Sequence, residues 1–190
     1  MKYLLILLVS FLSTLHSTAQ SIKISEIVQS DIQFMREEEK LARDVYDSLY
    51  LKWDLIPFEH IRTSEQNHMD QMKSLLNKFN LSDPVQITKD KKGLFQNALL
   101  SQYYNDLIAQ GSNSVIDALK VGAKIEEIDI KDLIDRAKNT KDKSILAVYE
   151  NLRLASERHL NAFTRNLHMR GIEYQPTILS TTLYNEIIKD

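Results

Sequence analysis

The sequence predicts an all-α protein, an antiparallel four-helix bundle with a long crossover between its second and third helices and a C-terminal extension. Glycine and proline are scarce, with 4 and 3 in 190 residues, which is too few for the frequent tight turns of a many-stranded β protein. Of these residues only Gly122 falls inside a long segment with helical periodicity, and the others fall between such segments. Each long segment carries one apolar stripe, and four such helices can bury a common core.

The first predicted helix begins near Ser30-Asp31, which can cap its N-terminus, and the second begins at Pro57, a residue suited to a first helical turn. These two helices span about residues 30–52 and 57–79. The remaining predicted elements are a crossover over residues 81–111 with a short helix at 98–109, a third long helix from Ser112 or Ser114 to about 138, a fourth over 143–170, and an apolar tail over 171–190 that packs across the bundle.

The composition limits the kinds of site that the chain can build. The sequence has no cysteine, which excludes disulfides, thiolate zinc sites and iron–sulfur clusters, so any metal must be bound by Asp, Glu and His. The net charge is −2 with 26% charged residues, and this balance gives no reason to expect nucleic acid as a partner.

The first residues have the pattern of a secretory signal peptide. Lys2 precedes a short apolar run, and the segment ends in the small residues Ser17-Thr18-Ala19. The run is too short to span a hydrocarbon layer of about 30 Å, so we expect cleavage before Gln20, with an uncleaved membrane anchor as the alternative. Residues 1–19 are therefore predicted as a signal peptide and 20–190 as one periplasmic or secreted domain, free of the membrane after cleavage.

Inward-facing carboxylates are informative because a buried carboxylate is costly unless it is paired or binds a cation. In the first predicted helix Glu39 lies on the apolar stripe, three residues before Ala42. Glu38 borders this stripe, whereas Glu37 and Lys40 are expected to be solvated.

The other three long helices also place metal-capable side chains on their apolar faces. Glu65 and His68 are three residues apart and therefore adjacent on the second helix. Glu126 lies on the stripe of the third helix with Asp129 one turn on, and His159 lies within the stripe of the fourth. One inward histidine is usually a hydrogen-bonded core residue, but four helices that each supply such a side chain favour a shared metal site.

Several of these motifs resemble known families. The spacing Glu39-x-x-Ala42-x-x-x-Tyr46, followed by Glu65-x-x-His68, resembles the first two helices of ferritin-like, rubrerythrin-type di-iron carboxylate proteins. More closely, residues 34–46, 112–132 and His159-Leu-x-Ala-Phe163 are similar to the DUF2202 family, a ferritin-like group of bacteria and archaea. The resemblance covers about residues 27–188 and implies a ferritin-like four-helix bundle.

The resemblance also implies a ligand set. Glu39 matches the terminal carboxylate of the first helix, Glu65 the bridging carboxylate of the second, and His68 its imidazole. Glu126 matches the carboxylate of the third helix and His159 the imidazole of the fourth.

The fourth helix departs from the family pattern, because Ser156 stands where a further glutamate is expected. Asp129 can supply an oxygen instead, and the site can hold one metal ion or two. The resemblance implies redox chemistry on iron, with manganese or zinc as other occupants and peroxide or dioxygen as partners. Tyr46 is expected to act beside the metal, with core packing as its other role.

The second hypothesis is a metal-free bundle that has lost a complete di-iron site and serves as a structural or partner-binding module. Homodimerisation stays open, and nothing in one sequence supports an iron-storage cage.

Overall fold

The computed structural model describes residues 23–188, so the predicted signal peptide and its cleavage site lie outside the described residues. Within this range the chain is all-helical and has no strand, which confirms the predicted class. The helices are α1 (Glu26–Trp53), α2 (Ile56–Lys78), α3 (Pro84–Ile87), α4 (Ala98–Gly111), α5 (Val115–Ala137), α6 (Lys143–His168) and α7 (Thr181–Ile187). No helix among residues 23–188 is long and apolar enough to cross a bilayer.

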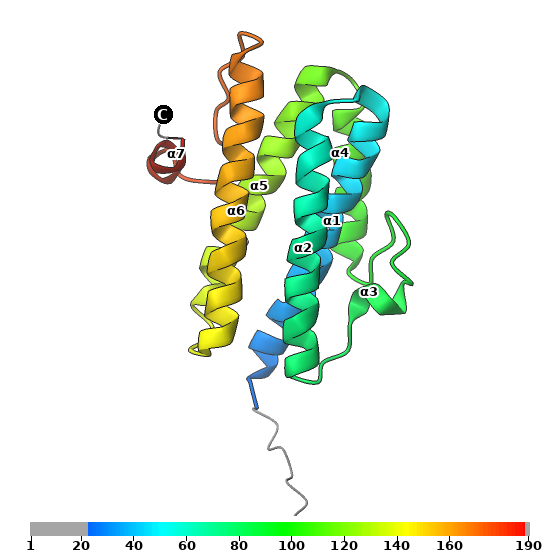
Figure 1. The fold of residues 1–190 in the computed structure, drawn as a ribbon, viewed down its shortest axis with the longest axis vertical. Helices are drawn as coiled ribbons and strands as arrows, with labels where there is room; N and C mark the ends of the chain where they lie inside the picture. The colour runs from blue at the N-terminus through cyan, green and yellow to red at the C-terminus, as the bar shows by residue number, and fades with distance from the viewer. Residues whose placement is uncertain (1–22, 189–190) are drawn as a thin grey trace, which may run out of the picture.

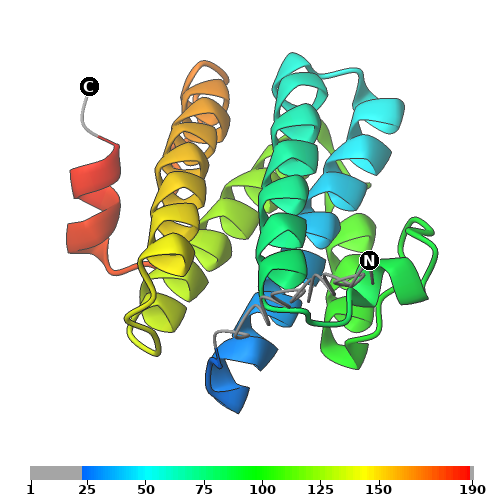
Figure 2. The same cartoon turned by 60° about the horizontal axis from the view of Figure 1, so that its bottom comes forward.

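The four long helices form two hairpins that lie side by side (Figures 1 and 2). Helix α1 packs along α2 and α5 along α6, while α1 also contacts α5 and α2 contacts α6. The chain between the hairpins contributes α3, which packs on α1, and α4, which packs on both α1 and α5. The C-terminal α7 lies beside α6 in both views.

Capping residues decide where the helices begin. Helix α1 starts at Glu26 rather than near residue 30, because the Ser25 side chain accepts a hydrogen bond from the Val28 N–H and caps the helix there. Of the two serines considered for the start of the third long helix, Ser114 is the cap of α5, and its hydroxyl accepts from the Asp117 N–H.

The crossover covers a face of α1 that the sequence pattern assigned to solvent. The expectation that Glu37 and Lys40 are solvated is wrong, since they are 3% and 0% exposed. Glu37 accepts hydrogen bonds from the backbone N–H groups of Gln96 and Asn97, at 2.5 and 3.0 Å. Glu37 is buried because the crossover, which is distant in the sequence, packs over it and uses its carboxylate as the acceptor for two backbone N–H groups.

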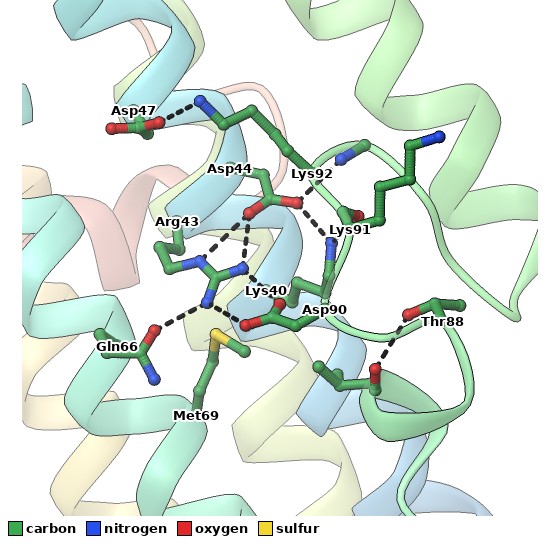
Figure 3. A network of polar contacts seen from close by, with 12 residues as sticks. Lys40, Arg43, Asp44, Asp47, Gln66, Met69, Thr88, Asp90, Lys91 and Lys92 are labelled. Carbon is green, nitrogen blue, oxygen red and sulfur yellow. Dashed lines mark hydrogen bonds and ion pairs between the residues drawn. The ribbon is translucent and has the colours of Figure 1, made fainter.

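Figure 3 shows a second set of polar contacts between the crossover and α1. Lys40 donates to Asp44 at 2.5 Å and to the Lys91 carbonyl at 2.9 Å, and Arg43 donates to both Asp44 and Asp90. Arg43 also donates to Gln66 of α2 at 2.7 Å, so one network joins α1, α2 and the crossover. Pairing on all sides makes the burial of Lys40 tolerable.

Two apolar clusters lie at different heights in the bundle. One includes Val28–Met35 side chains of α1 with parts of α2, α5 and α6, and the other includes Leu41–Leu49 side chains of α1 with other parts of the same helices. Between them each long helix presents polar side chains. This polar layer consists of Glu39, Glu65, His68, Glu126, Asp129, Ser156 and His159.

Gly122 explains how closely α5 and α6 approach next to this layer. A Cβ atom at this position would lie 2.5 Å from the Phe163 ring, well inside van der Waals contact. The ring of Phe163 packs against those of Tyr46 and Phe58, with centroids 5.4 and 5.2 Å away. These aromatic rings close one end of the polar layer to water.

Candidate metal centre

The first part of the polar layer is a group of three side chains from α1 and α2, which we call the Glu39 triad. It consists of Glu39, Glu65 and His68, all at most 3% exposed. His68 Nδ1 lies 2.7 Å from Glu65 Oε2 and 3.2 Å from Glu39 Oε2. One potential ligand atom from each residue lies within 4.8 Å of the others, so the three groups converge on one point.

The second part, the Glu126 triad, uses the other oxygen of the same central glutamate. His159 Nδ1 of α6 lies 2.9 Å from Glu65 Oε1 and 3.4 Å from Glu126 Oε2 of α5. Glu65 therefore faces a histidine with each of its oxygens, and the two imidazole rings lie 5.6 Å apart between centroids. The five side chains carried over as ligands from α1, α2, α5 and α6 thus meet in one place.

Several of these buried atoms have short contacts but no hydrogen bond. Glu65 Oε1 and His159 Nδ1 approach to 2.9 Å, yet neither has a hydrogen-bond partner among residues 23–188, because the contact does not have hydrogen-bond geometry. Glu39 Oε1 also has no partner within this range. In the Glu39 triad, by contrast, His68 Nδ1 is hydrogen-bonded to Glu39 Oε2 at 3.2 Å. Buried polar atoms are normally hydrogen-bonded, so ligand atoms such as Glu65 Oε1 and His159 Nδ1, which face each other without a hydrogen bond, suit an ion placed between them.

Burial and mutual charge shift the pKa values of the whole group. Burial works against the charged form of His68, but Glu65 and Glu39 outweigh it and raise its pKa to about 12. Burial also works against the charged form of His159, but Glu126 and Glu65 outweigh it and raise its pKa to about 10.

The carboxylates respond in opposite ways. Burial raises the pKa of Glu39 to about 7 in spite of His68 beside it. Burial also favours protonation of Glu65, but the two histidines outweigh it and hold the pKa of this carboxyl well below its usual range. The shifts therefore favour an ionised Glu65 carboxylate between positively charged His68 and His159.

Tyr46 lies next to the Glu126 triad. Its hydroxyl donates to Glu126 Oε1 at 2.6 Å, and the side chain is completely buried. Burial and the neighbouring Glu126 carboxylate raise the pKa of Tyr46, so the phenol keeps its proton as a hydrogen-bond donor. The residue also packs in the aromatic group with Phe58 and Phe163, which is the core-packing role expected of it.

Asp129 is the one predicted ligand that joins neither triad. Its Oδ2 accepts a hydrogen bond from the Ser156 hydroxyl at 2.5 Å, while Oδ1 has no partner among residues 23–188. Burial raises the pKa of Asp129 well above its usual value, and the nearby Glu39 and Glu38 carboxylates add to the shift. The position where a glutamate was expected is thus filled by a serine that holds an aspartate from the neighbouring helix.

Glu127 carries a role that the sequence pattern did not indicate. It is completely buried next to Glu126 in sequence, but it faces the C-terminal segment instead. Its oxygens accept from the Tyr174 hydroxyl at 2.6 Å and from the backbone N–H groups of residues 177–179, at 2.8 to 3.1 Å. This clamp fixes the apolar tail on the bundle, and only the position of a segment about fifty residues away reveals it.

The fold and the site together define an all-helical protein with two carboxylate–histidine triads that share one glutamate. Residues 29–190 match the model of the family described as "Uncharacterized protein domain (DUF2202)". The chain belongs to the DUF2202 family. It is 47% identical to uncharacterized protein MJ0754 of Methanocaldococcus jannaschii over 165 residues. This matched region covers 87% of this chain and 88% of that protein.

A solved structure gives the same picture of the fold. The crystal structure of hypothetical protein MJ0754 from Methanococcus jannaschii matches with a TM-score of 0.86 at 46% identity, covering 90% of this chain and 97% of that one.

Proposed function

We propose that this protein is a ferritin-like four-helix bundle that binds a non-haem metal centre in its polar layer. The observation that carries the proposal is Glu65, which presents one oxygen to the Glu39 triad and the other to the Glu126 triad. A carboxylate placed between two histidines in this way suits a bridge between two ions. We therefore favour a centre of two ions over a single one.

The separations between donor atoms fit this proposal. Two ligand atoms that each lie about 2.1 Å from one ion, at tetrahedral or octahedral angles, are about 3.0–3.4 Å apart. The contacts of the two histidines with their carboxylates span 2.7 to 3.4 Å. Small side-chain adjustments are enough to place an ion in each triad.

The donor set favours iron or manganese, with zinc as a further occupant, because it combines carboxylate oxygens with imidazole nitrogens. Bound iron would supply redox chemistry with dioxygen or peroxide, which is an oxidase or peroxidase type of activity. In that reaction Tyr46 keeps a proton 2.6 Å from Glu126 Oε1 and orients this carboxylate. The Tyr46, Phe58 and Phe163 rings exclude water from the same side.

Metal analysis of purified protein loaded with ferrous iron, manganese or zinc tests the proposal. We expect up to two ions per chain in the native protein, and loss of binding in Glu65→Ala and His68→Ala. A matched control is the exposed pair His168 and Glu173, whose side chains are 2.6 Å apart on the surface, and alanine at either position should leave binding unchanged. The absorption spectrum of the iron-loaded protein in air then distinguishes an oxo-bridged pair from a mononuclear site. The proposal is refuted if the native protein binds none of these metals, or if Glu65→Ala and His68→Ala bind as much metal as the native protein.

The alternative function is a metal-free structural or partner-binding bundle. The observation in its favour is Ser156, which together with Asp129 forms a hydrogen-bonded pair where a further metal-ligating glutamate was expected. A native protein that folds stably and binds none of the three metals would support this alternative.

We also propose that the protein is exported, because residues 1–19 have the charged start, apolar run and small-residue end of a signal peptide. Cell fractionation and N-terminal sequencing of the mature protein test this, with Gln20 as the expected first residue.

A further inference from the structure

A hollow lies where the C-terminal tail crosses the bundle, and none of its lining residues belongs to either triad. Side chains of α4, α5 and the tail surround a volume of about 300 Å³, which we call the α5–tail hollow. Its lining includes Gln110 of α4, Lys120 and Lys124 of α5, and Ile172, Tyr174 and Gln175 of the tail. Small-molecule sites measure about 300–1,000 Å³, so the hollow has the size of a site for a small ligand.

The clamp on Glu127 fixes the tail wall of the hollow. The Tyr174 hydroxyl donates to the Glu127 carboxylate at 2.6 Å, and the Thr177 N–H donates to it at 3.0 and 3.1 Å. Both Tyr174 and Thr177 also line the hollow. The wall is therefore formed without a ligand, and a preformed wall lowers the entropic cost of binding.

The other wall carries two positive charges. Lys120 and Lys124 are four residues apart on α5, so their half-buried side chains are neighbours on one helix face. Neither ammonium group forms an ion pair or a hydrogen bond within residues 23–188, whereas Lys131 of the same helix pairs with Asp135 at 2.6 Å. Like charges at this spacing destabilise a helix, so an anion between the two lysines is favourable.

The acidic residue of the lining does not neutralise these lysines. Glu173 points away from α5, because its carboxylate lies 2.6 Å from His168 Nδ1 of α6 and its side chain is 74% exposed. The Glu127 carboxylate behind the tail wall is already occupied by its donors from residues 174–179. The positive charge of the hollow is therefore available to a ligand.

The lining selects the chemistry of that ligand. Two ammonium groups suit a group with two negative charges, and the side-chain amides of Gln110 and Gln175 add neutral donors. Ile172 and Tyr174 offer an apolar surface beside them. We propose that the α5–tail hollow binds a small phosphate monoester, with its phosphate on Lys120 and Lys124 and its organic group against Ile172 and Tyr174. This site is separate from the proposed metal centre and does not depend on it.

Phenyl phosphate is the probe for this proposal, and ¹H–¹⁵N NMR titration is the measurement. At about pH 8 the probe carries close to two negative charges, because the second pKa of such a phosphate is about 6. We expect saturable shifts at the backbone amides of residues 120–124 and 172–177. Phenol lacks the phosphate, inorganic phosphate lacks the ring, and benzoate has a single charge, so each should bind about tenfold more weakly or worse.

Three lysine variants test the role of charge. Lys120→Gln and Lys124→Gln should each lower the affinity for phenyl phosphate about tenfold, because each removes one of the two charges and keeps a long polar side chain. Lys131→Gln is the matched control, since Lys131 lies on the same helix but pairs with Asp135, and it should leave the affinity unchanged. The comparison of ligands on the native protein keeps the test valid if a variant does not fold.

Phosphate groups also bind metal ions, so the titration uses chelator-treated protein and is repeated on Glu65→Ala. Equal binding by both supports the hollow, whether or not the native protein binds metal. The inference is overturned if phenyl phosphate fails to shift the residues of the hollow, or if its shifts centre on His68 and His159. It is equally overturned if phenol, inorganic phosphate or benzoate binds as tightly, or if Lys131→Gln weakens binding as much as Lys120→Gln.

Discussion

Removal of the Tyr46 hydroxyl should weaken one of the two proposed metal positions and spare the other. In Tyr46→Phe the ring stays in its aromatic contacts, while the hydroxyl loses its hydrogen bond to Glu126 Oε1, 2.6 Å long, and a longer one to the Gly122 carbonyl at 3.3 Å. Glu126 belongs to the triad of His159, whereas the hydroxyl makes no hydrogen bond with His68 or Glu39 within residues 23–188. The effect is therefore expected to be confined to the Glu126 triad.

The magnitude follows from burial. Both partners are at most 2% exposed, so the carboxylate oxygen that loses its donor cannot turn to water. An unsatisfied buried acceptor costs about 1–3 kcal/mol, and for a protein of this size each kcal/mol lowers the melting temperature by about 2–4 °C. Loss of a group that orients a metal ligand typically reduces metal affinity about 10- to 100-fold.

Isothermal titration with zinc and thermal unfolding of the metal-free protein measure both effects. Tyr149→Phe is a matched control, because Tyr149 is likewise buried, at 2% exposed, but its hydroxyl has no hydrogen-bond partner among residues 23–188. We expect this control to keep both affinities and its stability. The reasoning is refuted if Tyr46→Phe keeps both zinc affinities, or if it weakens both positions to the same degree.

Three further predictions concern pH, the tail and the serine. The free energy of unfolding of the metal-free protein should fall as pH rises above about 6.5, which is the pKa of a histidine in the unfolded chain. Above this pH the folded protein keeps protons on His68 (pKa about 12) and His159 (pKa about 10), whereas the unfolded chain has released them. Denaturant titrations at about pH 6 and about pH 9 measure this, and equal stability at both would contradict the charge assignment. Glu127→Gln should speed amide hydrogen exchange at residues 177–179, whose N–H groups bond to this carboxylate; unchanged exchange would argue against the clamp. Ser156→Ala should destabilise the metal-free protein by about 1–3 kcal/mol in chemical denaturation, because the buried carboxylate that accepts its hydroxyl loses a donor, and an unchanged midpoint would count against this pairing.

The periodic part of the structure could be predicted from local sequence. The ends of α2 and α4 lie within two residues of their predicted limits, because Pro57 and Asn97 fix their starts through local geometry. The start of α1 was wrong by about one turn, since Ser25 competes with Ser30 as a cap and only the structure decides between them.

The solvated face of α1 was the main error, and its cause is long-range. Glu37 and Lys40 lie off the apolar stripe, so helical periodicity assigns them to water. The crossover residues Lys91, Gln96 and Asn97 cover them and supply the hydrogen bonds that make burial possible.

The sequence by itself determined which residue types could form a site and on which helix faces they lie, because zero cysteine leaves only carboxylates and imidazoles and helical spacing sets their direction. Tertiary structure alone decided how these side chains share partners. It brought Glu65 between two histidines and turned Asp129 toward Ser156. Such distances depend on how four helices pack together, and that packing is set by contacts between residues far apart in the chain.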